Sequence, residues 1–213
     1  MIKLIVFDFD GVIISSHDLQ KEALHKVYEK LGRSGEPPYE TFFSHSGDSL
    51  QNIFQAMDIP VDMVQIYQEY SLKNMNLVKL QPGIINALKK LKVDGYFIAL
   101  CTGKESKRTH ILLEHFNIAS YFKWVICSDN IIKPKPDPES LITIMSMAKI
   151  KSEKTLMVGD GINDIKCAKA AGVKSIAVTW GDCKPENLLL ERPDYIVDSI
   201  EELIKTVHEQ KDI

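Results

Sequence analysis

The sequence predicts an α/β fold in which a parallel sheet is covered by helices on both faces. Short apolar runs recur along the chain, and segments with helical spacing of apolar residues separate most of them. Strands that alternate with helices favour a parallel sheet, because each crossover returns the chain to the same end of the sheet. The runs expected to form strands are residues 3–8, 96–101, 124–128, 155–158, 175–178 and 195–197.

Two of the helical segments begin with recognisable start signals. Asp137 and Pro138 precede one segment, where we expect an N-cap followed by proline at the first helical position. Ser199 and Glu202 have the spacing of a capping box before the last helix.

Residues 16–80 break the alternation of strands and helices. This region contains helical patterns, such as Leu24, Val27, Tyr28 and Leu31, and no convincing strand. We therefore expect residues 16–80 to form an all-helical insert directly after the first strand. Residues 1–15 and 81–213 would then form the α/β core.

Composition narrows the classes of partner. A net charge of −3 gives no reason to expect nucleic acid or an anionic membrane, and no apolar run approaches the roughly 20 residues that span a bilayer. The apolar N-terminal run contains acids, which argues against a signal peptide. The four cysteines lack metal-site spacing. We expect a cytoplasmic protein with reduced thiols, and nothing in the sequence demands more than a monomer.

Polar residues follow several of the predicted strands at the point where each strand ends. Ligands gather at the carboxyl ends of parallel strands, so these side chains are expected to share one crevice. Carboxylates crowd together only around a cation, and oxygen ligands favour Mg²⁺. A metal ion, a lysine and loop N–H groups together make a receptor for a phosphoryl group. The residues concerned are Asp8, Asp10, Thr102, Gly103, Asp160 and Asp164, with Lys133 and Lys135 in a further loop.

Two other interpretations of these motifs fail. An EF-hand loop beginning at Asp8 would need oxygen ligands where the chain has Val12 and Leu19. A dinucleotide-binding turn at 159–164 would place Asp160 and Asp164 where a pyrophosphate must sit.

Taken together, the motifs resemble those of the haloacid dehalogenase superfamily of phosphohydrolases. The four signatures are "DFDGV" at 8–12, "CTG" at 101–103, "KPKPD" at 133–137 and "GDGIND" at 159–164. The resemblance implies a Rossmann-like core and makes the helical insert a small cap. The stretch at 172–181 is similar to phosphoglycolate-phosphatase-like members.

The resemblance also implies roles for individual residues. Asp8 would be the nucleophile that becomes aspartyl-phosphate, and Asp10 would protonate the leaving oxygen and later deprotonate water. Lys133 is chosen over Lys135 because it directly precedes Pro-x-Pro-Asp. The Mg²⁺ ligands would be Asp8, Asp10 through its carbonyl, Asp160 and Asp164, and the phosphoryl oxygens would be bound by Thr102, Lys133 and N–H groups near Gly11 and Gly103.

These inferences favour a Mg²⁺-dependent phosphatase that acts on a small phosphorylated metabolite. Asp10 argues against a dehalogenase, which needs no acid for a halide. A sugar phosphomutase also keeps this residue and remains the alternative enzyme. A non-catalytic phospho-receiver or binding module is the alternative from another class.

The residues of the helical insert help to distinguish a phosphatase from a mutase. A mutase must hold a second phosphate, yet residues 34–72 contain no Lys or Arg. The stretch "SHSGDSL" at 44–50 is expected to face the site, with His45, Ser46 or Ser49 as substrate contacts. Asp48 would repel a second phosphate. We therefore expect a monophosphate whose remainder is neutral or hydrogen-bonding.

Overall fold

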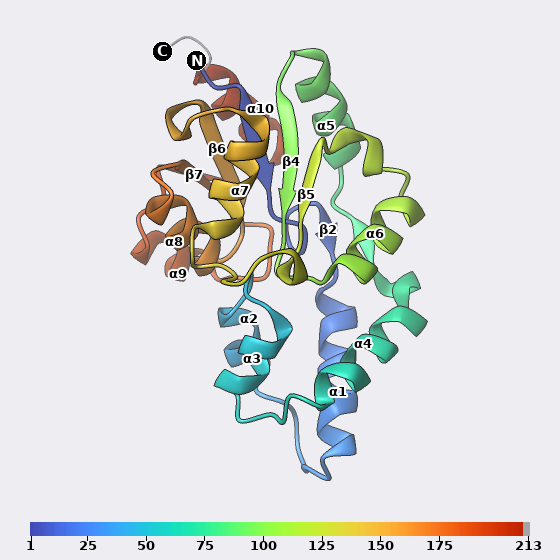
Figure 1. Cartoon of the computed structure of the whole chain (residues 1–213). Helices are drawn as coiled ribbons and strands as arrows, with labels where there is room; N and C mark the ends of the chain where they lie inside the picture. Colours follow the sequence, from blue (N-terminus) through green and yellow to red (C-terminus); the bar gives the residue numbers. More distant parts are fainter. Residues whose placement is uncertain (211–213) are drawn as a thin grey trace.

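The computed structural model describes residues 1–210, so the last three residues of the predicted core lie outside it. Its centre is a six-stranded sheet in the order β5-β4-β1-β6-β7-β8, in which every pairing is parallel (Figure 1). Each strand overlaps one predicted run, which confirms the predicted fold class. The strands are β1 (Leu4–Phe7), β4 (Phe97–Cys101), β5 (Trp124–Ile126), β6 (Thr155–Gly159), β7 (Lys174–Val178) and β8 (Tyr195–Val197).

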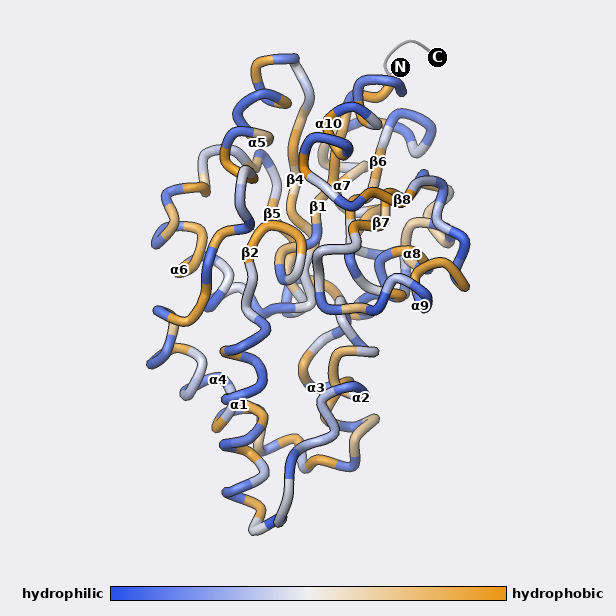
Figure 2. The backbone as a smooth tube through the Cα atoms, turned by 180° about the vertical axis from the view of Figure 1, so that it is seen from behind, coloured by the Kyte–Doolittle hydropathy of each residue, from blue (hydrophilic) through white to orange (hydrophobic). Residues whose placement is uncertain are grey.

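Helices cover both faces of this sheet. Side chains alternate along a strand, so Ile5 and Phe7 of β1 pack on one face while Leu4 and Val6 pack on the other. The first face is covered by α5 (Ile84–Val93), α6 (Ser106–His115) and α10 (Ile200–Glu209). The second is covered by α7 (Glu139–Ala148) and α8 (Ile162–Ala170), with α9 (Pro185–Leu190) beside α8. Strands β4 and β6 run as mainly hydrophobic stretches (Figure 2).

Four helices and a short 3₁₀ turn form the segment that follows β1. They are α1 (His17–Lys30), α2 (Tyr39–Ser44), α3 (Leu50–Ala56), α4 (Met63–Lys73) and η1 (Met75–Leu77). These helices lie together beyond one end of the sheet (Figure 1), around an apolar cluster of their own that includes Leu24, Val27 and Phe54. We call residues 17–77 the cap. Its treatment as a separate domain stays a prediction.

A small antiparallel ladder marks where the chain enters and leaves the cap. It pairs β2 (Ile14–Ser15) with β3 (Lys79–Leu80). Two residues are too few to show a period in the sequence, which is why neither strand was predicted. The remaining short turns are η2 (Ala119–Tyr121), η3 (Ser128–Asn130) and η4 (Ser152–Lys154).

The predicted helix starts are close to the observed ones. Pro138 is itself the N-cap of α7, and the Asp137 carboxylate accepts a hydrogen bond from the Glu139 N–H at 3.0 Å. Ser199 caps α10 as predicted, by accepting from the Glu202 N–H. The Glu202 carboxylate, however, accepts from the N–H of Asp198, one residue before the position that a capping box requires.

The strand order creates a crevice at the carboxyl end of β1. The chain passes from β1 to β4 on one side and later returns to β6 on the other side. The loops after β4 and β6 therefore leave in opposite directions, and the space between them lies above β1. Among residues 1–210, no helix combines the length and apolarity needed to cross a membrane.

Candidate active site

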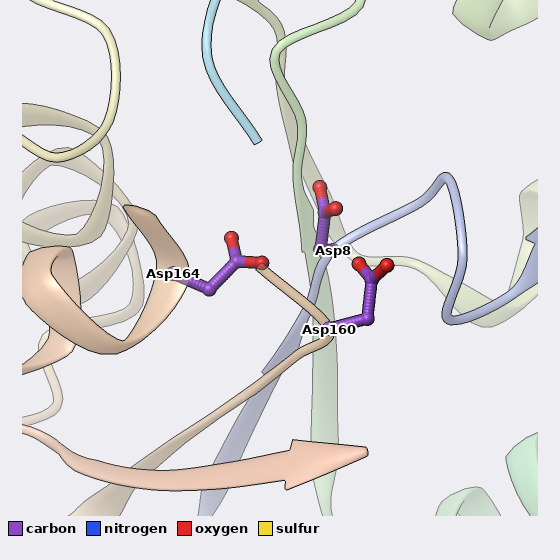
Figure 3. A group of neighbouring side chains, drawn as sticks. All are labelled: Asp8, Asp160 and Asp164. Carbon is purple, nitrogen blue, oxygen red and sulfur yellow. The ribbon is translucent and has the colours of Figure 1, made fainter. Parts of the chain in front are cut away.

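Three carboxylates converge in the crevice (Figure 3). Asp8 follows β1, Asp160 follows β6 and Asp164 lies in the first turn of α8. Each offers an oxygen within 4.8 Å of the others, and all three side chains are buried. The sequence predicted that these residues share a crevice at the carboxyl edge of the sheet, and in the folded chain their carboxylates form one cluster.

Glycines allow the backbone to pack against this cluster. Gly11 has φ +74°, and a Cβ there would lie 2.1 Å from Oδ2 of Asp160. A Cβ at Gly181 would lie 2.3 Å from the Cβ of Asp160. Any side chain at either position would displace Asp160, so glycine is required at both.

Lys135 supplies the cation inside the crevice. Its side chain is 2% exposed, and its Nζ donates to Asp8 Oδ1 at 2.9 Å and to Asp164 Oδ1 at 2.6 Å. A third bond of 3.1 Å goes to the Cys101 carbonyl. Burial alone would lower the pKa of Lys135, but attraction to Asp164 and Asp8 raises it above its usual range. The lysine therefore stays charged.

The structure does not place Lys133 in the crevice, which corrects the prediction made from the motif. Lys133 is exposed, and its backbone N–H donates to Oε2 of Glu139 at 2.8 Å. Glu139 also accepts from the N–H of Ile132 at 3.0 Å. These bonds tie the start of the loop to the surface, and the chain turns inward only at Lys135. The spacing to the prolines did not reveal which lysine is buried.

The cluster fits a hard divalent cation. Asp160 Oδ2 accepts from the N–H of Asp182 at 2.7 Å, but Asp160 Oδ1 is buried with no hydrogen-bond partner among the described residues. Burial, followed by the nearby Asp182 charge, raises the pKa of Asp160. Carboxylate oxygens that lack donors are the ligands that Mg²⁺ prefers, and such a cation would offset this unfavourable burial.

The metal-free chain is expected to lose stability as pH rises. Burial raises the pKa of Asp8 to about 7, against 3.8 for an unperturbed carboxyl. Between these values the folded chain binds a proton that the unfolded chain has released, so the free energy of unfolding falls with increasing pH. Urea unfolding in excess chelator at pH 5 and pH 8 measures the difference. Asp8→Asn should flatten this dependence, and an unchanged slope in that variant would contradict the assignment.

Asp10 stands apart from the carboxylate cluster. Its side chain accepts a hydrogen bond from the Ser16 hydroxyl, and its Oδ2 lies 3.2 Å from Nζ of Lys104. Asp10 therefore faces the start of the cap, where Ser16 directly precedes α1. The sequence predicted metal contact through its backbone carbonyl, which stays a prediction.

A cavity of about 50 Å³ lies where the cap meets the crevice. Thr102, Gly103 and Ser46 line it beside Asp8 and Asp10, and their predicted contacts with phosphate or substrate stay predictions. The cavity is otherwise bounded by cap residues and by two basic core residues: Gln20, Phe42, Phe43, Gly47, Asp48, Leu50, Ile53, Tyr67, Lys104 and Arg108.

His45 and Ser49 are not among the residues that line this cavity, and their role as substrate contacts stays a prediction. The Ser49 hydroxyl is occupied as the N-cap of α3, where it accepts from the Asn52 N–H at 3.3 Å. The carbonyl of His45 lies 3.5 Å from Nδ2 of Asn163, so this residue contacts the core through its backbone.

The cap lies directly against the core loops. A Cβ at Gly103 would be 2.0 Å from the Asp48 carbonyl oxygen, and one at Gly161 would be 2.6 Å from that of Ser46. Nδ1 of His17 also lies 2.8 Å from the carboxylate of Asp182, whose N–H holds Asp160. The backbone of the cap therefore packs directly against the core loops beside the cavity.

Comparison with known proteins agrees with this geometry. The family model described as haloacid dehalogenase-like hydrolase matches residues 5–178, which include all four motifs. The chain belongs to this family.

Similar members of this hydrolase family carry the name of a phosphatase. The chain is 32% identical to the phosphoglycolate phosphatase of Vibrio parahaemolyticus over 219 residues, covering 97% of this chain and 96% of the relative. Phosphoglycolate phosphatase 1 of Pseudomonas aeruginosa is 29% identical over 222 residues, covering 99% and 82%. A predicted phosphatase from Clostridium acetobutylicum superposes with a TM-score of 0.88 at 25% identity, covering 98% and 99%.

The chain is accordingly a phosphoric monoester hydrolase of the haloacid dehalogenase type. The alternative of a non-catalytic phospho-receiver or binding module was wrong. A strand-end aspartate alone would be compatible with a receiver, but the family match covers the whole constellation of motifs.

Two basic residues of the hydrolase cavity were missed from the sequence. Lys104 directly follows Gly103 in the second motif, and Arg108 lies in α6. Arg108 shares a helical face with buried Leu112, four residues later. The sequence could have revealed Arg108, because a charged residue on the buried face of a helix needs a partner of opposite charge.

Proposed function

We propose that this hydrolase is a Mg²⁺-dependent phosphatase that cleaves a small-molecule phosphate monoester through an aspartyl-phosphate at Asp8. The observation that carries the proposal is the buried cluster of Asp8, Asp160 and Asp164 around Lys135, of which Asp8 also lines the cavity between the core and the cap. The relatives named phosphoglycolate phosphatase support a substrate of that size and kind.

The covalent step begins at Asp8. A carboxylate oxygen of Asp8 attacks phosphorus, the bond from phosphorus to the ester oxygen breaks, and protonated Asp10 gives its proton to the leaving oxygen. Water then attacks the aspartyl-phosphate and gives a proton to Asp10, which releases phosphate and restores Asp8. The position of Asp10 beside the cavity and outside the carboxylate cluster supports this acid–base role.

Mg²⁺ would be held by Asp8 and Asp160, with Asp164 and the carbonyl of Asp10 nearby. When bound, it supplies positive charge that lets a phosphate dianion approach the carboxylates. The unpartnered Oδ1 of Asp160 supports this assignment.

The transferring phosphoryl group would contact Thr102, Lys135 and backbone N–H groups near Gly11 and Gly103. Lys135 replaces Lys133 in this role because it alone of the two is bonded to Asp8. Phosphoryl transfer depends mainly on positioning and charge neutralisation, and a buried lysine bonded to Asp8 contributes to both.

We place the reaction in the cytoplasm, and we expect a monomer. The four cysteines are all free, which is the state typical of a reducing compartment.

Phosphate release from a panel of small esters tests the proposal. We expect turnover with Mg²⁺, loss of turnover in excess chelator and recovery when Mg²⁺ is added back. A second readout is thermal unfolding, in which Mg²⁺ should raise the melting temperature of the wild type.

The control for this test is Asp160→Asn, which removes one charge from the cluster and nearly preserves its shape. The stabilisation by Mg²⁺ should shrink strongly in this variant. Full activity in chelator, or equal stabilisation of both proteins by Mg²⁺, would show that the cluster does not bind the metal.

A further inference from the structure

The cavity contains two cations that the proposed mechanism leaves without a role. Lys104 follows Gly103 in the loop after β4, and Arg108 lies in the first turn of α6. Their side chains are only 9% and 7% exposed. Both line the cavity on the side of the core. Cations that are so far removed from water are placed there at a cost, which anionic partners offset, and each has one carboxylate partner in the structure, Asp10 for Lys104 and Glu105 for Arg108.

Arg108 is held rigidly between the core and the cap. Its Nε and Nη2 donate to the two carboxylate oxygens of Glu105, each at 2.6 Å. Its guanidinium carbon lies 5.6 Å from the ring centre of Tyr67, which comes from α4 of the cap. The two bonds to Glu105 occupy only part of the donor set of a guanidinium. The side chain is thus oriented in advance and keeps donors for a planar anion.

Lys104 lies close to the point where the ester bond would break. Its Nζ is 3.2 Å from Oδ2 of Asp10, the residue proposed to protonate the leaving oxygen. The ammonium is therefore within about two hydrogen-bond lengths of that oxygen. A carboxylate bound by Lys104 could therefore lie on a carbon close to the ester oxygen.

The size and charge of the cavity restrict the anion further. A volume of about 50 Å³ holds only a few water-sized groups. A hexose remainder would need the cap to move away, whereas a short acid would need little more room. Asp48 adds a negative group to the wall, which opposes a second phosphate more strongly than a single carboxylate.

We propose that Lys104 and Arg108 form a carboxylate-binding subsite that selects phosphate monoesters bearing a carboxylate one or two carbons from the ester oxygen. The inference rests on the proposed phosphatase function. It replaces the expectation of a neutral remainder, which considered cations of the cap alone. The cap has no Lys or Arg in residues 34–72, but the core supplies two at the surface that the cap covers.

The test compares two substrates that differ only in the group of interest. One is 2-phosphoglycolate, and the other is 2-hydroxyethyl phosphate, in which a hydroxymethyl group replaces the carboxylate. The quantity measured is the ratio of kcat/KM for the acid to kcat/KM for the alcohol, because general damage to the site cancels in it. For the wild type we expect a ratio of about 30 or more.

Arg108→Gln and Lys104→Gln should each lower this ratio by about tenfold. Lys107→Gln is the matched control, since it removes an exposed cation from the same helix and should leave the ratio unchanged. Because Arg108→Gln leaves Glu105 without its partner, the double variant Glu105→Gln, Arg108→Gln provides a second measurement in which no unpaired charge remains.

Different failures separate the two proposals. Release of phosphate from both esters at similar kcat/KM, or a ratio that the Lys104 and Arg108 variants do not change, would overturn the subsite and leave the phosphatase standing. If the wild type with Mg²⁺ released no phosphate from any ester, the proposed function would fall and the subsite with it.

Discussion

Asp8→Asn is expected to lower phosphate release by about 10⁴-fold or more, because an amide cannot attack phosphorus and is a poor ligand for Mg²⁺. The fold should survive this change. Asp8 is buried and its pKa is raised to about 7, so a neutral group of nearly the same shape suits the position in the metal-free chain. Lys135 would keep its bond to Asp164.

The measurement is single-turnover phosphate release together with urea unfolding. Asp18→Asn is the matched control, since Asp18 is an exposed aspartate in the first turn of α1 and should leave turnover unchanged. Activity of Asp8→Asn within tenfold of the wild type would remove Asp8 as the nucleophile.

Lys135→Met is expected to abolish activity and to destabilise the chain by about 3 kcal/mol, because removing one partner of a buried ion pair leaves the other charge uncompensated. Both Asp8 and Asp164 depend on this lysine, and the methionine would fill its space without its charge. Urea unfolding in excess chelator measures the loss without interference from bound metal.

Lys133→Met is the control that the chain itself provides. Lys133 is exposed, and its backbone N–H donates a hydrogen bond to Glu139, which the substitution keeps. Activity and stability should stay close to the wild type, as for most surface substitutions. If Lys133→Met lost activity while Lys135→Met kept it, the motif would have been aligned correctly from the sequence and the geometry described here would be wrong.

The fold was predictable from the sequence because its signals are local. Each strand of the sheet is a short, mostly apolar run, and the central strands β1 and β6 are buried on both faces, so these runs stand out against helical spacing of apolar residues. The carboxylate cluster was predictable for a related reason. Asp8 and Asp160 directly follow strands, and parallel strands end at the same edge.

The sequence could not decide which of two neighbouring lysines enters the crevice. Lys133 and Lys135 lie in one loop, each directly before a proline, and the direction that a loop takes leaves no periodic pattern in the sequence. The contacts of Glu139 decide which lysine enters. Its carboxylate accepts hydrogen bonds from the backbone N–H groups of Ile132 and Lys133 and holds them at the surface. Lys135 then meets the buried carboxylates.

The walls of the cavity were likewise decided by tertiary structure. His45 and Ser49 lie in the stretch expected to face the site, but neither lines the cavity: Ser49 caps α3, and the carbonyl of His45 contacts Asn163. Arg108 reaches the cavity because α6 packs on the sheet and α4 of the cap brings Tyr67 against it. By itself, the sequence determined the sheet and the carboxylates at its edge, since the apolar runs mark the strands and Asp8 and Asp160 directly follow two of them. Which cations meet those carboxylates depended on contacts between segments far apart in the chain.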